Sequence, residues 1–177
     1  TRDAHIALKR HLLAATNITE RLQTLAALWS SSSPDAYEAL ENERTRLCKS
    51  LTGKIGYFSI IGQKSGVEAV DAVCEAEKLP EFSITHPGIR RALYMPLIGN
   101  NSAIWTERGM QWFAQTVIKV AGIGEYAANR MLDAVQNYRS FDPAIAGRVE
   151  TALRTIQSTL DKDKNPWIRA KVDSFLS

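Results

Sequence analysis

Apolar residues recur at every third or fourth position along most of the chain, and this is the spacing of one face of an amphipathic helix. The clearest stripe consists of Ile18, Leu22, Leu25 and Trp29. Alternation of apolar and polar residues, which would indicate strands, is absent. The one β-like run, residues 57–61, lies among helical patterns and is interpreted as a buried helical segment.

Residues that favour the start of a helix precede several of these stripes. Ser, Asp or Asn before a stripe favours an N-cap, Glu three positions later completes a capping box, and Pro suits the first turn. Such starts are predicted at Asn17 with Glu20, Ser33-Pro34, Ser65 with Glu68, His86-Pro87, Asp142-Pro143 and Asn165-Pro166. Pro96 is expected to bend or end its helix, because proline lacks the N–H that the helix needs.

Roughly eight to ten helices of two to four turns follow from these signals, one of them over residues 125–138. Short turns join consecutive helices, and none of the helices can bury its apolar face alone. The predicted fold is therefore all-α: a right-handed α-solenoid of antiparallel helix pairs, of the ARM/HEAT type. Residues 1–177 are expected to form a single helical domain. Because the sequence starts at Thr1 in a helical pattern, we expect it to be part of a longer protein.

Composition excludes several classes of protein. The 45% hydrophobic and 23% charged residues are typical of a globular domain, and the net charge of +3 is too small to indicate a dedicated nucleic-acid binder. Cys48 and Cys74 are too few for a disulfide framework and are expected to be buried, reduced thiols. No apolar run is long enough to cross a bilayer. These features favour a soluble cytoplasmic protein.

A catalytic site is not evident. The histidines are His5, His11 and His86, and none is followed by Glu, so the H-E-x-x-H zinc motif is absent. His5 and His11 are six residues apart and would lie on different faces of a helix. His86 suits a helix N-cap better than a metal site. The chain alone is thus expected to hold no metal and to have no enzymatic activity.

One local motif suggests a different function. Gly122-Ile123-Gly124, with Ala128 following, matches the hairpin of helix-hairpin-helix modules, in which backbone amides bind a nucleic-acid phosphate. The alternative is a tight turn between helices, with the glycines at positive φ. We favour the turn, since only Lys119 and Arg130 supply positive charge nearby. A nucleic-acid module and a non-enzymatic helical scaffold remain as rival hypotheses.

Four segments, in order along the chain, resemble the C-terminal domain of bacterial-type aminopeptidase N enzymes. Residues 82–93 are similar to the family phrase F-x-x-x-N-P-x-x-x-R-x-L, and residues 15–22 to A-x-N-M-T-D-R-x. Residues 124–132 are similar to a family turn that leads into an arginine-bearing helix. Residues 139–153 resemble the phrase that opens the penultimate helix. The chain differs at His86 and Ile89, where Asn and Arg are common, and in a shorter loop around residues 107–109.

The resemblance implies a parent zinc aminopeptidase that releases N-terminal amino acids from short peptides. Its zinc would lie in an upstream catalytic domain, which this domain would cap to form a restricted substrate chamber. By position in the family motifs, Arg91, Tyr126 and Arg130 are implied to line the chamber, although Gln is common where Tyr126 stands. The implied partners are the catalytic domain and short peptides, with neither a membrane nor a nucleic acid.

Overall fold

A computed structural model describes residues 2–31 and 35–177, and every regular element within these ranges is helical. The all-α prediction is thus confirmed. The described residues form eleven α-helices and two short 3₁₀ helices, slightly more than predicted. The chain divides into two compact units, residues 1–100 and 101–177.

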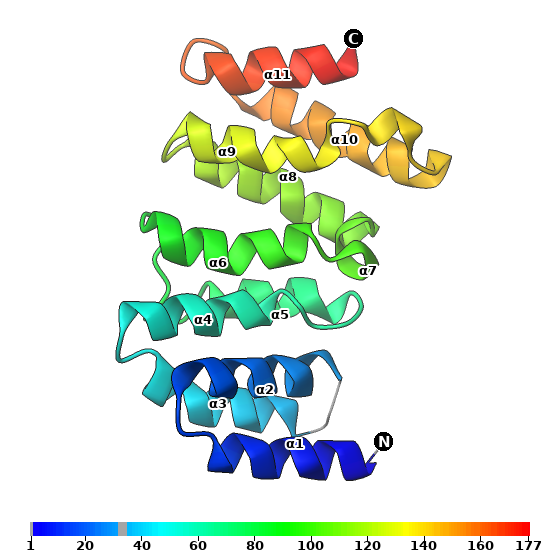
Figure 1. The fold of residues 1–177 in the computed structure, drawn as a ribbon. Helices are drawn as coiled ribbons and strands as arrows, with labels where there is room; N and C mark the ends of the chain where they lie inside the picture. The colour runs from blue at the N-terminus through cyan, green and yellow to red at the C-terminus, as the bar shows by residue number, and fades with distance from the viewer. Residues whose placement is uncertain (1, 32–34) are drawn as a thin grey trace. The chain divides into compact units, whose positions relative to one another are not determined.

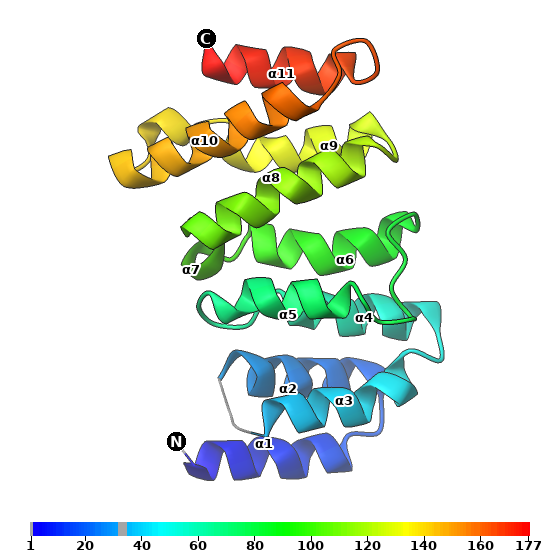
Figure 2. The same ribbon diagram turned by 180° about the vertical axis from the view of Figure 1, so that it is seen from behind.

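Six helices lie in the described part of the first unit. They are α1 (Arg2–Ala14), α2 (Ile18–Ser30), α3 (Ala36–Leu47), α4 (Leu51–Ile61), α5 (Glu68–Ala76) and α6 (Pro87–Ile98). Helices α2, α4 and α6 pack side by side in one layer, and α3 and α5 lie behind them (Figures 1 and 2). Residues 57–61 belong to α4 and are largely buried, as predicted.

The second unit begins with the single-turn helix α7 (Asn101–Ile104). It continues with α8 (Glu107–Ala121), α9 (Glu125–Leu132), the 3₁₀ turns η1 (Asp133–Val135) and η2 (Tyr138–Ser140), α10 (Pro143–Thr159) and α11 (Pro166–Leu176). Helices α8 and α10 form one layer and α9 and α11 the other, as the two opposite views show (Figures 1 and 2). Two faces of this unit are therefore distinct: an α8/α10 face and an α9/α11 face.

Three predicted caps are confirmed by their hydrogen bonds. The Asn17 side chain accepts the Glu20 N–H at 2.9 Å, and Asp142 accepts that of Ala144 at 2.9 Å. His86 Nδ1 accepts the Ile89 N–H at 3.3 Å. These caps were predictable because each partner lies two or three residues away.

Other helix boundaries differ from the predictions. Ser65 and Glu68 do not form a capping box, since α5 has Val67 at its N-cap and the Ser65 hydroxyl donates to Ser30 O at 2.9 Å. The helix predicted over 125–138 ends at Leu132 and gives way to 3₁₀ turns. Helix α6 continues through Pro96 to Ile98.

The remaining differences concern residues that were assigned a local role. The expected start at Ser33-Pro34 lies outside the described residues. Cys48 and Cys74 are half-buried thiols that form no disulfide, and they are less enclosed than expected. Among the described glycines only Gly66 has a positive φ, so the expectation of positive φ at Gly122 and Gly124 is wrong.

Candidate functional site

Tyr126 and Arg130 lie four residues apart on α9 and so share one face of that helix. The helix starts at Glu125, with Gly124 at its N-cap, directly after the turn that ends α8. Tyr126 is 76% exposed, and the Arg130 side chain is 69% exposed. The short α9 thus presents an aromatic ring and a guanidinium group to solvent side by side.

A shared carboxylate fixes the Arg130 side chain. Asp133 Oδ2 lies 3.0 Å from Arg130 Nη1, while Asp133 Oδ1 accepts a hydrogen bond from Lys171 Nζ at 2.5 Å. Lys171 lies on α11 and also donates to the Asn129 backbone oxygen at 2.9 Å and to its side-chain oxygen at 2.6 Å. Three acceptors match the three donors of the ammonium group, so Lys171 is held in place.

The charges of this cluster do not cancel locally. Two cations, Arg130 and Lys171, share the single carboxylate of Asp133. Only one arm of the exposed guanidinium is engaged by Asp133, which leaves further N–H groups directed at solvent. A guanidinium in this state can bind a carboxylate or a carbonyl oxygen of a ligand.

The neighbouring helix α11 contributes a second exposed aromatic residue. Glu125, the first residue of α9, accepts the backbone N–H groups of Trp167 at 2.9 Å and Ile168 at 3.0 Å. These bonds place the start of α11 beside the start of α9. The Trp167 side chain is 65% exposed and lies next to the helix that carries Tyr126.

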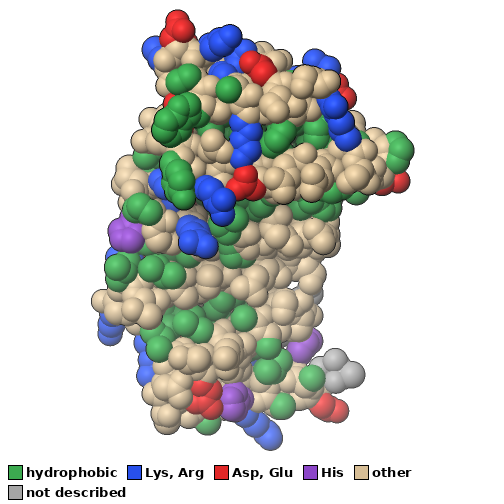
Figure 3. Space-filling view, turned by 45° about the horizontal axis from the view of Figure 1, so that its top comes forward, with side chains coloured by type: hydrophobic (Ala, Val, Ile, Leu, Met, Phe, Trp, Pro, Cys, Tyr) green, Lys and Arg blue, Asp and Glu red, His purple; other side chains and the backbone are tan. Residues whose placement is uncertain are grey.

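We call the set Tyr126, Arg130, Asp133, Trp167 and Lys171 the α9/α11 surface. Hydrophobic, basic and acidic side chains interleave over α9 and α11 in the space-filling view (Figure 3). Of these five residues, sequence analysis identified only Tyr126 and Arg130. Asp133 lies only three positions from Arg130. The contacts that add Trp167 and Lys171 join residues about forty positions apart in the chain, and no local motif indicates them.

Arg91 is the third residue implied by the resemblance. It belongs to the first unit, where its side chain is exposed on α6. Its neighbour Arg90 is half-buried instead and donates to Ile84 O at 2.8 Å. Arg91 therefore does not share the structural role of Arg90, which bonds to the backbone of the preceding loop.

The Gly122–Gly124 turn lacks the features of a phosphate site. Gly122 ends α8 with φ −65°, and Gly124 is extended, with φ 178°. The first turn of α9 carries the Glu125 carboxylate, which would repel a phosphate at that helix N-terminus. The geometry thus favours the interpretation as a turn between helices over the nucleic-acid module.

No group of three or more His, Cys, Asp or Glu residues that could hold a metal ion occurs in the part of the chain that the structure describes. None of the helices within residues 2–31 and 35–177 is both long and apolar enough to span a membrane.

Comparison with known proteins places this helical architecture among ARM-repeat domains. The chain belongs to the family described as a domain of unknown function with ARM repeats (DUF3458_C), whose family model matches residues 1–166. The α-solenoid prediction is thereby confirmed. None of the curated proteins matches the chain.

A solved structure shares the fold. Aminopeptidase A of Legionella pneumophila, crystallised in complex with aspartic acid, superimposes with a TM-score of 0.90 at 18% sequence identity. The match covers 99% of this chain but only 21% of that one, so this chain spans about a fifth of the length of the aminopeptidase. Together, the family and the fold support the resemblance to the C-terminal helical domain of an aminopeptidase N-type enzyme.

Proposed function

We propose that this chain is the C-terminal domain of a zinc-dependent aminopeptidase that releases N-terminal amino acids from short peptides. In this proposal the domain caps the active site and lines the substrate chamber. The fold shared with a fifth of a solved aminopeptidase supports a catalytic partner elsewhere in the same polypeptide. The zinc would belong to that partner, where a bound metal activates water for attack on a peptide bond.

The observation that carries the proposal is the exposed Arg130 guanidinium. Asp133 orients it, and Lys171 in turn orients Asp133. A side chain held in this way loses less conformational entropy when it binds a ligand than a freely rotating arginine does. The α9/α11 surface would hold the C-terminal part of a peptide through its carboxylate or a carbonyl oxygen, with Tyr126 and Trp167 packing against apolar side chains.

Arg91 would act in the same way from the first unit. Its exposed guanidinium would bind a carboxylate or a carbonyl oxygen of a peptide independently of the α9/α11 surface. The role of the domain would then be to position peptides and to exclude folded chains and bulk water, while the chemistry is performed elsewhere.

Replacing Arg130 tests the proposal in the full-length parent enzyme. We expect Arg130→Ala to lower kcat/KM for a short peptide about tenfold or more, the effect of losing a charged hydrogen bond. A single-residue chromogenic amide, which is too short to reach Arg130, should be cleaved within about twofold of the wild-type rate.

Arg154→Ala is the matched control. Arg154 is 61% exposed on α10, in the other layer of the same unit, and pairs with Glu150 much as Arg130 pairs with Asp133. Its loss should leave both substrates unaffected. An equal loss of activity on the peptide and on the amide in Arg130→Ala would contradict a role in lining the chamber.

A further inference from the structure

A groove on the α8/α10 face of the second unit has no part in the proposed function. Its volume is about 410 Å³, which is within the range of small-ligand sites. Met110, Ala114 and Ala152 are buried and form its floor. The groove lies in the opposite layer of the unit from the α9/α11 surface, so it is a separate candidate site.

Gly147 lines the groove and is exposed to solvent. Gly147 lies within α10, and a Cβ atom added there would meet no other atom within 4 Å. Glycine in the interior of a helix is less favourable than alanine by roughly 0.5–1 kcal/mol. Neither a turn nor a close packing contact requires glycine here. The open space beside Gly147 is part of the groove.

Two rows of polar side chains border the floor. Gln111 and Gln115 lie one turn apart on α8, and Thr151 and Thr155 lie one turn apart on α10. Four residues advance a helix by about 6 Å, whereas two residues of an extended peptide advance by about 6.6–6.8 Å. The spacing of the side chains within each row is therefore close to the two-residue repeat of an extended peptide, at which equivalent backbone groups recur.

The chemistry of the rows also suits a peptide backbone. The Thr151 hydroxyl donates to Gly147 O at 2.9 Å and the Thr155 hydroxyl to Thr151 O at 3.0 Å, so both oxygens are left to act as acceptors. Side-chain amides such as those of Gln111 and Gln115 offer both donors and acceptors. An extended chain has unpaired N–H and C=O groups that need such partners, whereas a helix satisfies its own.

The charges of the groove favour an uncharged occupant. Glu107 and Arg148 both line it. Arg148 donates to Trp105 O at 3.0 Å, which places it near the start of α8, where Glu107 also lies. One acid and one base at the same end leave no net charge, and the rest of the lining is neutral.

We propose that this groove binds a free, uncharged peptide in extended conformation, through backbone hydrogen bonds to Gln111, Gln115, Thr151 and Thr155. This goes beyond the proposed function, and the site would exist whether or not the α9/α11 surface handles substrates.

The probe is a capped hexapeptide of alternating alanine and serine, added to the 177-residue protein while the side-chain amide signals of Gln111 and Gln115 are followed by NMR. We expect saturable shifts that are unchanged when salt is raised about tenfold, because no net charge is involved. The same peptide with alternate backbone nitrogens methylated lacks the required donors and should produce no shifts.

Variants locate the binding in the groove. Gly147→Leu should fill the groove and abolish binding without loss of Tm, while Gly147→Ala, which adds one methyl group, should retain it. Gln115→Ala should weaken binding about three- to tenfold, as expected for one lost hydrogen bond. Gln136→Ala is the matched control, since Gln136 is exposed outside the groove, and should bind like the wild type.

Several outcomes would overturn the proposal. These are an absence of saturable shifts, wild-type affinity in Gly147→Leu, or equal binding of the methylated peptide. Concentration-dependent dimers that Gly147→Leu dissociates would show that a second copy occupies the groove instead. Arg130→Ala should leave this binding unchanged, so the groove and the α9/α11 surface can fail independently.

Discussion

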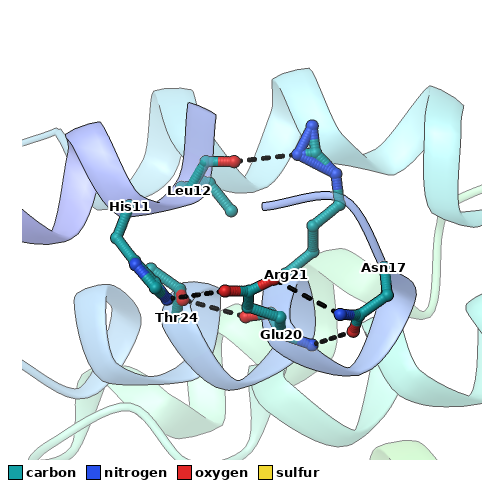
Figure 4. Close-up of polar contacts among 6 residues, drawn as sticks. All are labelled: His11, Leu12, Asn17, Glu20, Arg21 and Thr24. Carbon is teal, nitrogen blue, oxygen red and sulfur yellow. Dashed lines mark hydrogen bonds and ion pairs between the residues drawn. The ribbon is translucent and has the colours of Figure 1, made fainter. Parts of the chain in front are cut away.

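Arg21 is one of the few charged side chains that the first unit buries. It is 7% exposed, donates to Leu12 O at 2.8 Å and lies 3.6 Å from the Glu43 carboxylate. The close-up shows it linking the end of α1 to α2, beside the Asn17–Glu20 cap and the His11–Glu20 ion pair (Figure 4). This one guanidinium therefore satisfies a carbonyl of α1 by a hydrogen bond and balances the charge of a carboxylate of α3.

Removing Arg21 should be costly, since it leaves the Glu43 side chain, which is only 13% exposed, without its cation. We expect Arg21→Met to lower the free energy of unfolding by about 3 kcal/mol, measured by urea denaturation. The double variant Arg21→Met/Glu43→Leu should recover most of that loss, because no unpaired charge then remains. Arg46→Met on the exposed side of α3 is the control. A double variant no more stable than Arg21→Met would contradict the ion-pair explanation.

Roles of single residues that depend on local contacts could be predicted from the sequence, whereas roles that depend on long-range contacts could not. His86 caps α6 through an N–H three residues away, and the local sequence is sufficient to indicate it. Lys64 is 4% exposed, with its ammonium 4.5 Å from the Trp29 ring and 4.6 Å from the Tyr37 ring. These rings come from α2 and α3, so Lys64 is buried by contacts that only the fold creates.

Helix α11 illustrates how one element is stabilised by another. Asn165 occupies its N-cap position, as predicted, but its side chain makes no capping hydrogen bond. Glu125 of α9 performs that function, accepting the N–H groups of both Trp167 and Ile168. A carboxylate there also interacts favourably with the positive end of the helix dipole.

Loss of this cap should loosen the start of α11. We expect Glu125→Ala to destabilise the protein by about 1–2 kcal/mol and to speed amide hydrogen exchange at Trp167 and Ile168. Glu125→Gln keeps an acceptor and should cost less. Glu150→Ala removes a carboxylate paired with a solvent-exposed arginine of α10 and should cost no more than about 0.5 kcal/mol. Unchanged exchange at Trp167 in Glu125→Ala would show that the contact does not cap the helix.

Helix boundaries that depend on local residues could be predicted, whereas those that depend on distant contacts could not. Proline and capping residues correctly indicated the starts of α2, α6 and α10. The end of α9 at Leu132 was not predictable, because its periodic pattern continues beyond that residue. The prediction that Ser65 caps the following helix was wrong, since its hydroxyl donates a hydrogen bond to the backbone oxygen of Ser30.

For the molecule as a whole, periodicity and short turns were sufficient to predict an all-α solenoid. They did not reveal the division into two compact units or the pairing of layers within each. Nor could they show that Tyr126 and Arg130 share a surface with Trp167, because that surface depends on α9 and α11 lying in one layer. The pattern of apolar positions is sufficient to predict the fold class, whereas the surface site depends on how the helices pack.

Global stability should depend on the ionisation of two buried tyrosines in the first unit. Tyr57 and Tyr94 are each 1% exposed, at the ends of an aromatic series that runs through Phe58 and Phe82. Burial raises the pKa of both phenols above its ordinary value. The charge of Glu41 raises the pKa of Tyr57 further, and the charge and hydrogen bond of Glu77 do so for Tyr94.

The sign of the pH effect follows from these raised pKa values. Below about pH 10 both tyrosines are protonated whether the chain is folded or unfolded, so their ionisation does not make stability depend on pH there. Above that pH the unfolded chain loses protons that the folded chain retains, and each tyrosine should lower stability by up to about 1.4 kcal/mol per pH unit. Urea unfolding at a series of pH values should show a shallower decline in stability above pH 10 for Tyr94→Phe than for the wild type. If the two curves stayed parallel through the alkaline range, the Tyr94 phenol would not be the group whose ionisation opposes folding.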